Sequence, residues 1–245
     1  MDIDASGEAT ADLSRFDIDA TLSGANVTTG ISELDAALTG ALSAEIKAAR
    51  DGAAIRIDTA RLASDLVSVN AQGELGPVNS AITLDARLAN VAPFVPGFSG
   101  AATVNGTVTQ LEDARLALDL DATGPGGTLA AISGDTAFDA SQLSLDINGR
   151  APLGLLNRFL EPRSLAGDIG FDLRLEGPPA LESLSGRLSS ANARLVAPAL
   201  GITLDNTNLN VTLANATAGI SAVANVSTGG RLGVEGQLSL TGQRN

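Results

Sequence analysis

Pairs of aspartates at two-residue spacing are the first candidates for chemistry in this sequence. The pairs are Asp2 and Asp4, Asp17 and Asp19, and Asp119 and Asp121. Side chains two residues apart share one face of a β-strand, so each pair could bind calcium or serve as the two acids of a glycoside hydrolase. Each pair lies opposite aliphatic positions, however, and the chain has no Trp or Tyr to stack on sugar. We interpret the pairs as the polar face of amphipathic strands.

The residue types that are missing exclude further chemistry. The 245 residues include no Cys and no His, which excludes thiol chemistry, the usual zinc sites and histidine general bases. The formal net charge of −13 argues against nucleic acid, because phosphate binding needs clustered Lys and Arg. We expect a protein that is not an enzyme, with no catalytic residue, no metal, no cofactor and no nucleic-acid partner.

Two other groups could contact phosphate. Gly124–Gly127 has the composition of a phosphate loop, but no Lys-Ser/Thr follows, so a hairpin turn is the better interpretation. Arg158, Arg163 and Arg174 could pair with a lipid phosphate or with nearby acids. A local ion pair or a solvated side chain is the better interpretation for these arginines.

Aliphatic residues alternate with other residues along most of the chain, as in Leu116–Ala122 and Ile169–Leu175. A period of two predicts β-strands with one apolar face and one polar face. Connections are short, whereas parallel strands need crossovers of about a dozen residues or more. We therefore expect an all-β fold built from an antiparallel meander. Toward the C-terminus the pattern predicts separate short runs, such as Ile202–Leu204 and Leu209–Leu213.

Three segments break the alternation and carry apolar residues at helix-like spacing. These plug segments are Ile31–Leu38, Val91–Phe98 and Pro152–Leu160. We expect a short helical turn in each. They would lie against the apolar face of the sheet at intervals or cap its end.

A glycine closes each plug segment, and a strand restarts in the same register two residues later. The glycines are Gly40, Gly100 and Gly167, at separations of 60 and 67 positions. The recurrence indicates an internal repeat in an elongated assembly. The predicted organisation is one continuous segment with approximate repeat units 1–75, 76–142 and 143–245.

A continuous aliphatic face cannot remain in water, since burial of apolar surface is worth about 25 cal/mol per Å². The sheet can pack on a second sheet, close into a barrel or curl into a trough. Gly73, Gly106 and Gly170 are predicted on the inward face, where a missing side chain permits tight curl.

If the sheet curls, its aliphatic residues line a groove. The predicted lining residues are Phe16, Ile18, Leu22, Ile55, Ile57, Val67, Val69, Ile82, Leu84, Val104, Val108, Leu116, Leu118, Leu120, Leu143, Leu145, Ile147, Ile169, Phe171, Leu173, Leu175, Ile202, Leu204, Val211, Leu213, Ile220, Leu232, Val234 and Leu238.

The C-terminal part of the chain resembles the TamB family, the inner-membrane subunit of the bacterial translocation and assembly module, within the wider AsmA-like proteins. The resemblance lies in Ala151–Leu160, Leu165–Gly167, Leu184–Leu188 and Leu209–Asn215. The recurrence of plug segments and strands extends it over almost the whole chain.

The resemblance implies a long β-trough, called a β-taco or repeating β-groove, that crosses the periplasm. It implies phospholipid as the cargo, an outer-membrane barrel partner of the Omp85 class bound through the parent chain, and a parent anchored in the inner membrane of a Gram-negative bacterium. It also implies a link to outer-membrane protein assembly. We expect this chain to be a middle segment of such a protein.

The residues agree with a lipid conduit, because each methylene moved from water into an apolar groove gains about 0.8 kcal/mol. A smooth aliphatic wall also lacks the convergent polar groups that hold an oriented ligand. Two alternatives remain: a structural or adhesive surface protein of the β-helix type, and a polysaccharide-acting β-enzyme. An open apolar slot would favour the conduit over both.

Overall fold

The computed structural model describes residues 2–30, 32–76, 80–111 and 115–240, with the side chains of 32–34 left out. Ile31, the first residue of a plug segment, lies outside the described residues. The chain divides into two compact units, Met1–Gly124 and Pro125–Asn245.

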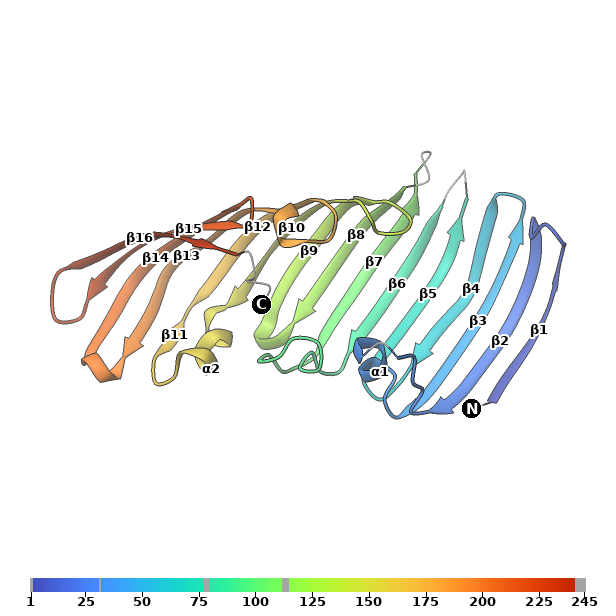
Figure 1. The fold of residues 1–245 in the computed structure, drawn as a ribbon, viewed down its shortest axis with the longest axis horizontal. Coiled ribbons are helices and arrows are strands. Elements are labelled where there is room, and N and C mark those ends of the chain that lie inside the picture. The colour runs from blue at the N-terminus through green and yellow to red at the C-terminus, as the bar shows by residue number, and fades with distance from the viewer. Residues whose placement is uncertain (1, 31, 77–79, 112–114, 241–245) are drawn as a thin grey trace. The chain divides into compact units, whose positions relative to one another are not determined.

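Unit 1 is an antiparallel sheet in which each strand pairs with the next strand along the chain (Figure 1, blue to green). Its first and last strands do not pair with each other, so the sheet is open. Its elements are β1 (Asp2–Ala9), β2 (Arg15–Ala25), α1 (Ser32–Ala37), β3 (Ala41–Asp51), β4 (Ala54–Ala63), β5 (Val67–Leu75), β6 (Ala81–Leu88), β7 (Ala102–Gln110) and β8 (Leu116–Gly124).

Unit 2 is also an open antiparallel sheet, with β10 paired to β12 and the short β11 paired to β13. Its elements are η1 (Pro125–Gly127), β9 (Thr128–Thr136), β10 (Leu143–Pro152), η2 (Leu153–Leu156), α2 (Asn157–Leu160), β11 (Ser164–Ala166), β12 (Asp168–Gly177), η3 (Leu181–Ser183), β13 (Leu184–Ala197), η4 (Pro198–Leu200), β14 (Ile202–Ala214), β15 (Thr217–Val226) and β16 (Arg231–Ser239).

The expected fold class is confirmed: the chain is all-β, with an antiparallel sheet and short helical turns. The alternation did not predict β9. That strand carries large apolar residues on both faces, Leu129 on one and Ile132 on the other, so it has no clean period of two.

Two β-bulges join segments that the sequence pattern separates. β14 is a single strand from Ile202 to Ala214. Its pairing register with β15 shifts by one residue between Asp205 and Asn208. Leu204 pairs with Val226 and Leu209 pairs with Ala222, two partners that are four residues apart on β15. The one extra residue of the bulge therefore keeps both leucines on the same face. In a regular strand without a bulge, two residues five positions apart would lie on opposite faces.

The second bulge, in β13, does the same. The register shifts between Ser190 and Ala193, and Asn192 has a φ of 62°. Leu188 and Leu195 both remain on the side that pairs with the aliphatic residues of β14. The sequence pattern predicts a strand break between Leu188 and Ala193, where the structure has a bulge.

The three plug segments fold differently from one another. The first forms α1 and the third forms η2 followed by α2, as expected. The middle segment makes one turn, in which the Val95 amide donates to the Val91 carbonyl at 2.9 Å. Pro96 has no N–H and disfavours helical geometry at Val95, so the turn does not extend into a helix.

The glycine after each plug segment does recur as one structural feature. In every case the glycine carbonyl accepts a hydrogen bond from a backbone N–H at the start of the connection. The bonds are Asn26 N–H to Gly40 at 2.9 Å, Val91 N–H to Gly100 at 2.9 Å, and Leu153 N–H to Gly167 at 2.8 Å. The three connections follow β2, β6 and β10, at intervals of four strands.

Burial is shallow. None of the described side chains is less than 2% exposed. The chain exposes 14667 Å², whereas a folded protein of 24.5 kDa is expected to expose about 10,000 Å². Val91 and Leu153, which begin the second and third plug segments, and Leu42, which follows the first, are among the side chains less than 10% exposed. Leu145, Leu204 and Ala218 on the apolar face are also less than 10% exposed, whereas Ile3, Ile46 and Leu238 on the same faces are 44–62% exposed.

Candidate apolar groove

The apolar face of unit 1 consists of rows of directly paired residues that cross all eight strands. One row is Ile3, Leu22, Ala44, Leu62, Val69, Ala86, Val104 and Ala122. The next is Ala5, Ala20, Ile46, Ala60, Ala71, Leu84, Gly106 and Leu120. Paired residues of antiparallel strands lie on the same face, with Cβ atoms about 5 Å apart. The two rows therefore make a continuous aliphatic surface.

A hollow of about 340 Å³ lies on this surface. Ile3, Leu22, Ile46, Leu62 and Val69 contribute its largest apolar side chains. Ile3 is 62% exposed and Ile46 is 44% exposed. Among the residues that the structure describes, no second layer covers these two side chains.

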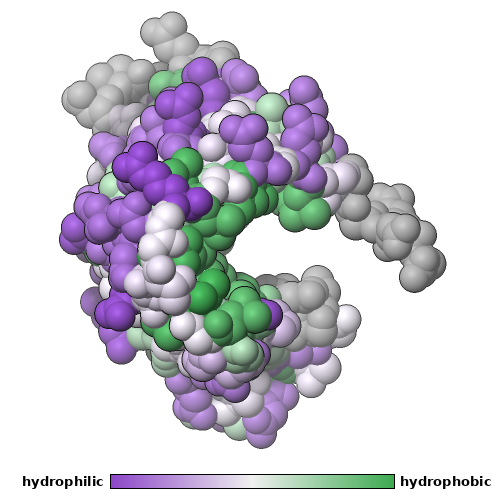
Figure 2. Space-filling model, turned by 90° about the vertical axis from the view of Figure 1, so that its left-hand side faces the viewer, coloured by the Kyte–Doolittle hydropathy of each residue, from purple (hydrophilic) through white to green (hydrophobic). Residues whose placement is uncertain are grey.

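Unit 2 repeats the arrangement. One row is Ala130, Gly149, Phe171, Leu188, Val211, Ile220 and Gly236, and the next is Ile132, Ile147, Leu173, Gly186, Leu213, Ala218 and Leu238. Figure 2, in which the end that carries β13 to β16 faces the viewer, shows hydrophobic residues lining a hollow and hydrophilic residues outside it. The open face is again the apolar one.

The strand register places every predicted lining residue on the apolar face of its unit. Those of unit 1 are Phe16, Ile18, Leu22, Ile55, Ile57, Val67, Val69, Ile82, Leu84, Val104, Val108, Leu116, Leu118 and Leu120. Those of unit 2 are Leu143, Leu145, Ile147, Ile169, Phe171, Leu173, Leu175, Ile202, Leu204, Val211, Leu213, Ile220, Leu232, Val234 and Leu238. That these residues bind lipid remains a prediction.

Of the three glycines predicted on the inward face, two lie there. Gly73 pairs with Ile82, and Gly106 pairs with Leu120. Gly170 pairs with Arg150 and Ser189 on the polar face, so that prediction was wrong. Its neighbours Ile169 and Phe171 take the apolar side, because successive residues of a strand alternate.

Gly73 occupies a position that other residues would strain. Its φ is 139°, and a Cβ would collide with the Ala81 carbonyl and lie 2.8 Å from the Cα of Ile82. Only glycine adopts this backbone conformation readily, and its missing side chain lets adjacent strands approach closely at the apolar face.

The polar face carries the paired aspartates. Asp19 lies 3.3 Å from the Lys47 ammonium, both carboxylate and ammonium being half exposed. Asp119 pairs with Thr107, and Asp121 pairs with Asn105. Within the described residues no group of three or more potential ligands could hold a metal ion.

Three aspartates have lowered pKa values: Asp12 and Asp139 lie in turns, and Asp35 lies in α1. Hydrogen bonds from Thr10 and then Ser14 lower the pKa of Asp12 from its ordinary 3.8 to about 2. Bonds from Thr29 lower the pKa of Asp35, and bonds from Ser141 lower that of Asp139. Each carboxylate accepts bonds from nearby backbone and hydroxyl groups, which stabilises the charged form and fixes the turn.

Two of the three candidate phosphate-binding arginines, Arg174 and Arg158, have local partners. Arg174 pairs with Asp146 on the neighbouring strand at 3.5 Å. The Arg158 guanidinium lies 5.5 Å from the centre of the Phe159 ring, within cation–π range.

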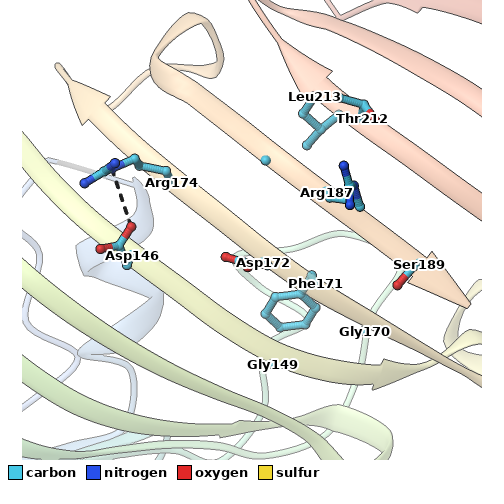
Figure 3. A pocket seen from close by; sticks show the side chains of 11 residues that line it. Asp146, Gly149, Gly170, Phe171, Asp172, Arg174, Arg187, Ser189, Thr212 and Leu213 are labelled. Atoms are coloured by element: carbon cyan, nitrogen blue, oxygen red, sulfur yellow. Dashed lines mark ion pairs between the residues drawn. The ribbon is translucent and has the colours of Figure 1, made fainter.

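A polar hollow of about 770 Å³ lies in unit 2 (Figure 3). Asp146, Asp172, Arg174 and Arg187 line it, and the rest of its lining is Gly149, Gly170, Phe171, Gly186, Ser189, Thr212 and Leu213. The ion pair between Asp146 and Arg174 crosses it. Two acids and two bases balance in charge, and no nucleophile is paired with a base, so the hollow favours neither catalysis nor an ion of one sign.

Two features of the site were missed in the sequence. The amide oxygens of Asn26, Asn90 and Asn157 each accept a backbone hydrogen bond that closes a plug connection, from Gly40, Gly100 and Leu165 respectively. An Asn about 10 to 14 positions before each recurrent glycine was the available signal.

The second missed feature is Arg50. It lies directly opposite Phe16 of β2 and Ile55 of β4 in the sheet. It is therefore on the apolar face of β3, the face that also carries Leu42, Ala44, Ile46 and Ala48. Within the described strands it is the one charged residue on the apolar side.

No helix in the described residues has the length and apolar character needed to cross a membrane. Comparison with known proteins found no match to a family model, a curated protein or a solved structure.

Proposed function

We propose that the apolar faces of the two units hold the acyl chains of phospholipid, and that the protein is a non-enzymatic lipid conduit of the TamB and AsmA-like type. The observation that carries the proposal is the continuous aliphatic surface of each unit, on which side chains such as Ile3, Ile46 and Leu238 remain exposed. A surface of this size calls for a partner, because large exposed apolar patches mark interaction sites.

The composition of the wall favours mobile acyl chains over a fixed ligand. The four rows consist of Leu, Ile, Val, Ala and Gly with a single aromatic residue, Phe171, and they offer few polar atoms that could fix an orientation. A ligand held in one pose needs convergent polar groups. The rows recur from strand to strand, so neighbouring positions present similar surfaces to a lipid.

The wider setting is part of the same proposal. We place the protein in the periplasm as a segment of a chain that is anchored in the inner membrane and contacts an outer-membrane barrel protein. Phospholipid would pass along it, and outer-membrane protein assembly would depend on it. The acidic polar face suits a protein that keeps its outer side in water.

The alternative of a β-helix-like adhesive protein loses its structural basis. All the pairings found between described strands are antiparallel, whereas a β-helix stacks parallel rungs. A polysaccharide-acting enzyme lacks support too, because the paired aspartates lie on the polar face, where Asp19 is ion-paired with Lys47 and Asp119 and Asp121 lie opposite Thr107 and Asn105.

Site-specific photocrosslinking in bacterial cells tests the proposal. A crosslinking residue at Leu118 or Leu204, on the apolar face, should capture phospholipid. The same residue at the adjacent Asp119 or Asp205, on the polar face, should not. Equal capture from both faces, or none from either, would refute the conduit.

A further inference from the structure

The strand β16 forms the outer edge of the sheet in unit 2, and among the residues that the structure describes no strand pairs with its far side. All nine of its residues are exposed. On its apolar side Leu232, Val234 and Leu238 are 40%, 50% and 56% exposed. An edge strand presents unpaired N–H and C=O groups on which another strand can add. The edge of β16 is therefore a candidate interaction surface.

The hydrogen bonds to β15 define which residues of β16 face the open edge. The Leu240 amide donates to the Ala216 carbonyl at 2.7 Å, one pair beyond the end of β16. Successive residues of an antiparallel strand direct their N–H and C=O groups alternately to one neighbour and to the other. The even-numbered residues of β16 therefore face β15. Arg231, Gly233 and Glu235 direct their backbone groups to the open edge.

Two charges without partners lie on this edge. The side chains of Arg231 and Glu235 are on the polar side of β16, opposite the uncharged Asn225 and Ser221 of β15. Neither side chain has an ion-pair or hydrogen-bond partner among the described residues. Gly233 lies midway between them. The edge thus presents a cation and an anion at equal distances from a central glycine.

A second copy of β16 fits this pattern. A twofold axis through Gly233, perpendicular to the sheet, makes the two strands antiparallel and keeps their apolar sides together. Arg231 of each copy then lies directly opposite Glu235 of the other. All three pairs fall at positions where both residues direct their N–H and C=O groups to each other. Opposite charges at directly paired positions stabilise an antiparallel pair of strands, and like charges destabilise it.

The charges select this register over the next one. An axis through Glu235 would place Glu235 against Glu235 of the other copy and leave Arg231 opposite Ser239, so no opposite charges would pair. The axis through Gly233 also suits the apolar side, because it sets Leu232 against Val234 of the other copy. The aliphatic surfaces of the two copies of unit 2 would then join.

The end strand of unit 1 lacks this complementarity. The polar side of β1 carries Asp2, Asp4 and Glu8 and no cation. Two copies of β1 would bring carboxylates together without a compensating charge. Charged side chains of this kind are one way in which natural edge strands avoid association. The charges therefore favour self-pairing at β16 and oppose it at β1.

We propose that two copies of the protein associate through β16, in an antiparallel twofold pairing centred on Gly233. The paired stretch runs from Arg231 to Glu235, so the interface is small and the association is weak and dependent on concentration. The proposal goes beyond the lipid conduit and does not depend on it.

Analytical ultracentrifugation of the whole chain over a wide range of protein concentrations tests the proposal with charge reversals. Arg231→Glu and Glu235→Arg each place like charges at two paired positions, so each variant alone should dimerise about tenfold more weakly than the parent chain. An equimolar mixture of the two variants pairs opposite charges again and should restore dimerisation. The double variant with both reversals should also dimerise like the parent.

An introduced thiol tests the register, because the chain has no Cys. A Cβ at Gly233 would meet nothing within 4 Å. Hydrogen-bonded antiparallel partners lie about 5.5 Å apart at Cα, which is within the range that a disulfide spans. Gly233→Cys should therefore form covalent dimers on mild oxidation. Gly219→Cys, on the same side of β15 and one strand in from the edge, should remain monomeric.

A parent chain that stays monomeric at every concentration would overturn the proposal. Dimers that withstand both single reversals, a mixture of the two variants that stays monomeric, or equal cross-linking of the two thiol variants would overturn it as well. Dimers that withstand the reversals but dissociate in Leu84→Glu would assign the contact to the apolar faces of the sheets instead.

Discussion

Gly186 of β13 lies directly opposite Leu173 of β12, and a Cβ at Gly186 would lie 2.8 Å from the Cα of Leu173. The Gly186 φ of 131° is equally unsuited to an L side chain. We expect Gly186→Ala to destabilise the protein by about 1–3 kcal/mol, through backbone strain and close contact. Urea unfolding measures the difference.

Gly219→Ala is the control, because Gly219 is a strand glycine whose Cβ would meet only the Thr212 carbonyl, at 3.9 Å. It should change stability by less than about 1 kcal/mol. Equal effects of the two substitutions would show that Gly186 is not required for close approach of β12 and β13.

A charge in the middle of the apolar face should reduce its affinity for apolar molecules. Leu84 pairs with Ala71 and Gly106 within an aliphatic row. Leu84→Glu should weaken binding of diphenylhexatriene, an apolar probe that fluoresces in apolar surroundings, by about tenfold. Thr83→Glu, one residue along and on the polar face, should leave probe binding intact. The same loss in both variants would argue against the groove.

The asparagine of the middle plug connection should matter for stability. The Asn90 amide oxygen accepts from the Ala92 and Gly100 amides, both at 3.1 Å. Loss of two neutral hydrogen bonds in Asn90→Ala should cost about 2 kcal/mol. Asn105→Ala, at an exposed position of β7, should cost less than about 0.5 kcal/mol. Thermal unfolding of both variants compares them, and an unaffected Asn90→Ala would remove the role assigned to that side chain.

The turn at Asp12 should show a defined acid dependence. Its pKa is lowered to about 2 by hydrogen bonds from Thr10 and Ser14. A carboxylate with a lowered folded pKa contributes stability above its unfolded pKa and loses it as the pH falls through the folded value. The difference in melting temperature between the parent and Asp12→Ala should therefore be constant above about pH 4 and shrink toward pH 2.

An NMR titration of the Asp12 carboxyl gives an independent measurement. Ser14→Ala removes the hydroxyl that donates to Asp12 Oδ1 at 2.8 Å, so it should raise the pKa of Asp12 toward 3.8. An unchanged pKa would show that the hydroxyl does not hold the carboxylate.

The alternation of side chains determined most of this fold. Where aliphatic residues keep a period of two, as in Leu116–Gly124 and Asp168–Gly177, a strand is found and its aliphatic side belongs to the apolar face of its unit. This is predictable because the period alone decides which side chains share a side of a strand. The recurrence of a glycine after each plug segment was also visible in the sequence. In the structure the carbonyl of each of these glycines accepts the backbone hydrogen bond that closes the connection.

Tertiary structure decided the rest. The bulge that keeps Leu204 and Leu209 on one face depends on their partners in β15, and no local pattern reveals a register shift. Arg50 is one arginine among several in the sequence, and it stands out only when the register sets it between Phe16 and Ile55. The sequence by itself determined which residues are apolar and how they alternate. Whether that surface stays open depends on what covers it, and burial is a property of the assembled sheet rather than of any one strand.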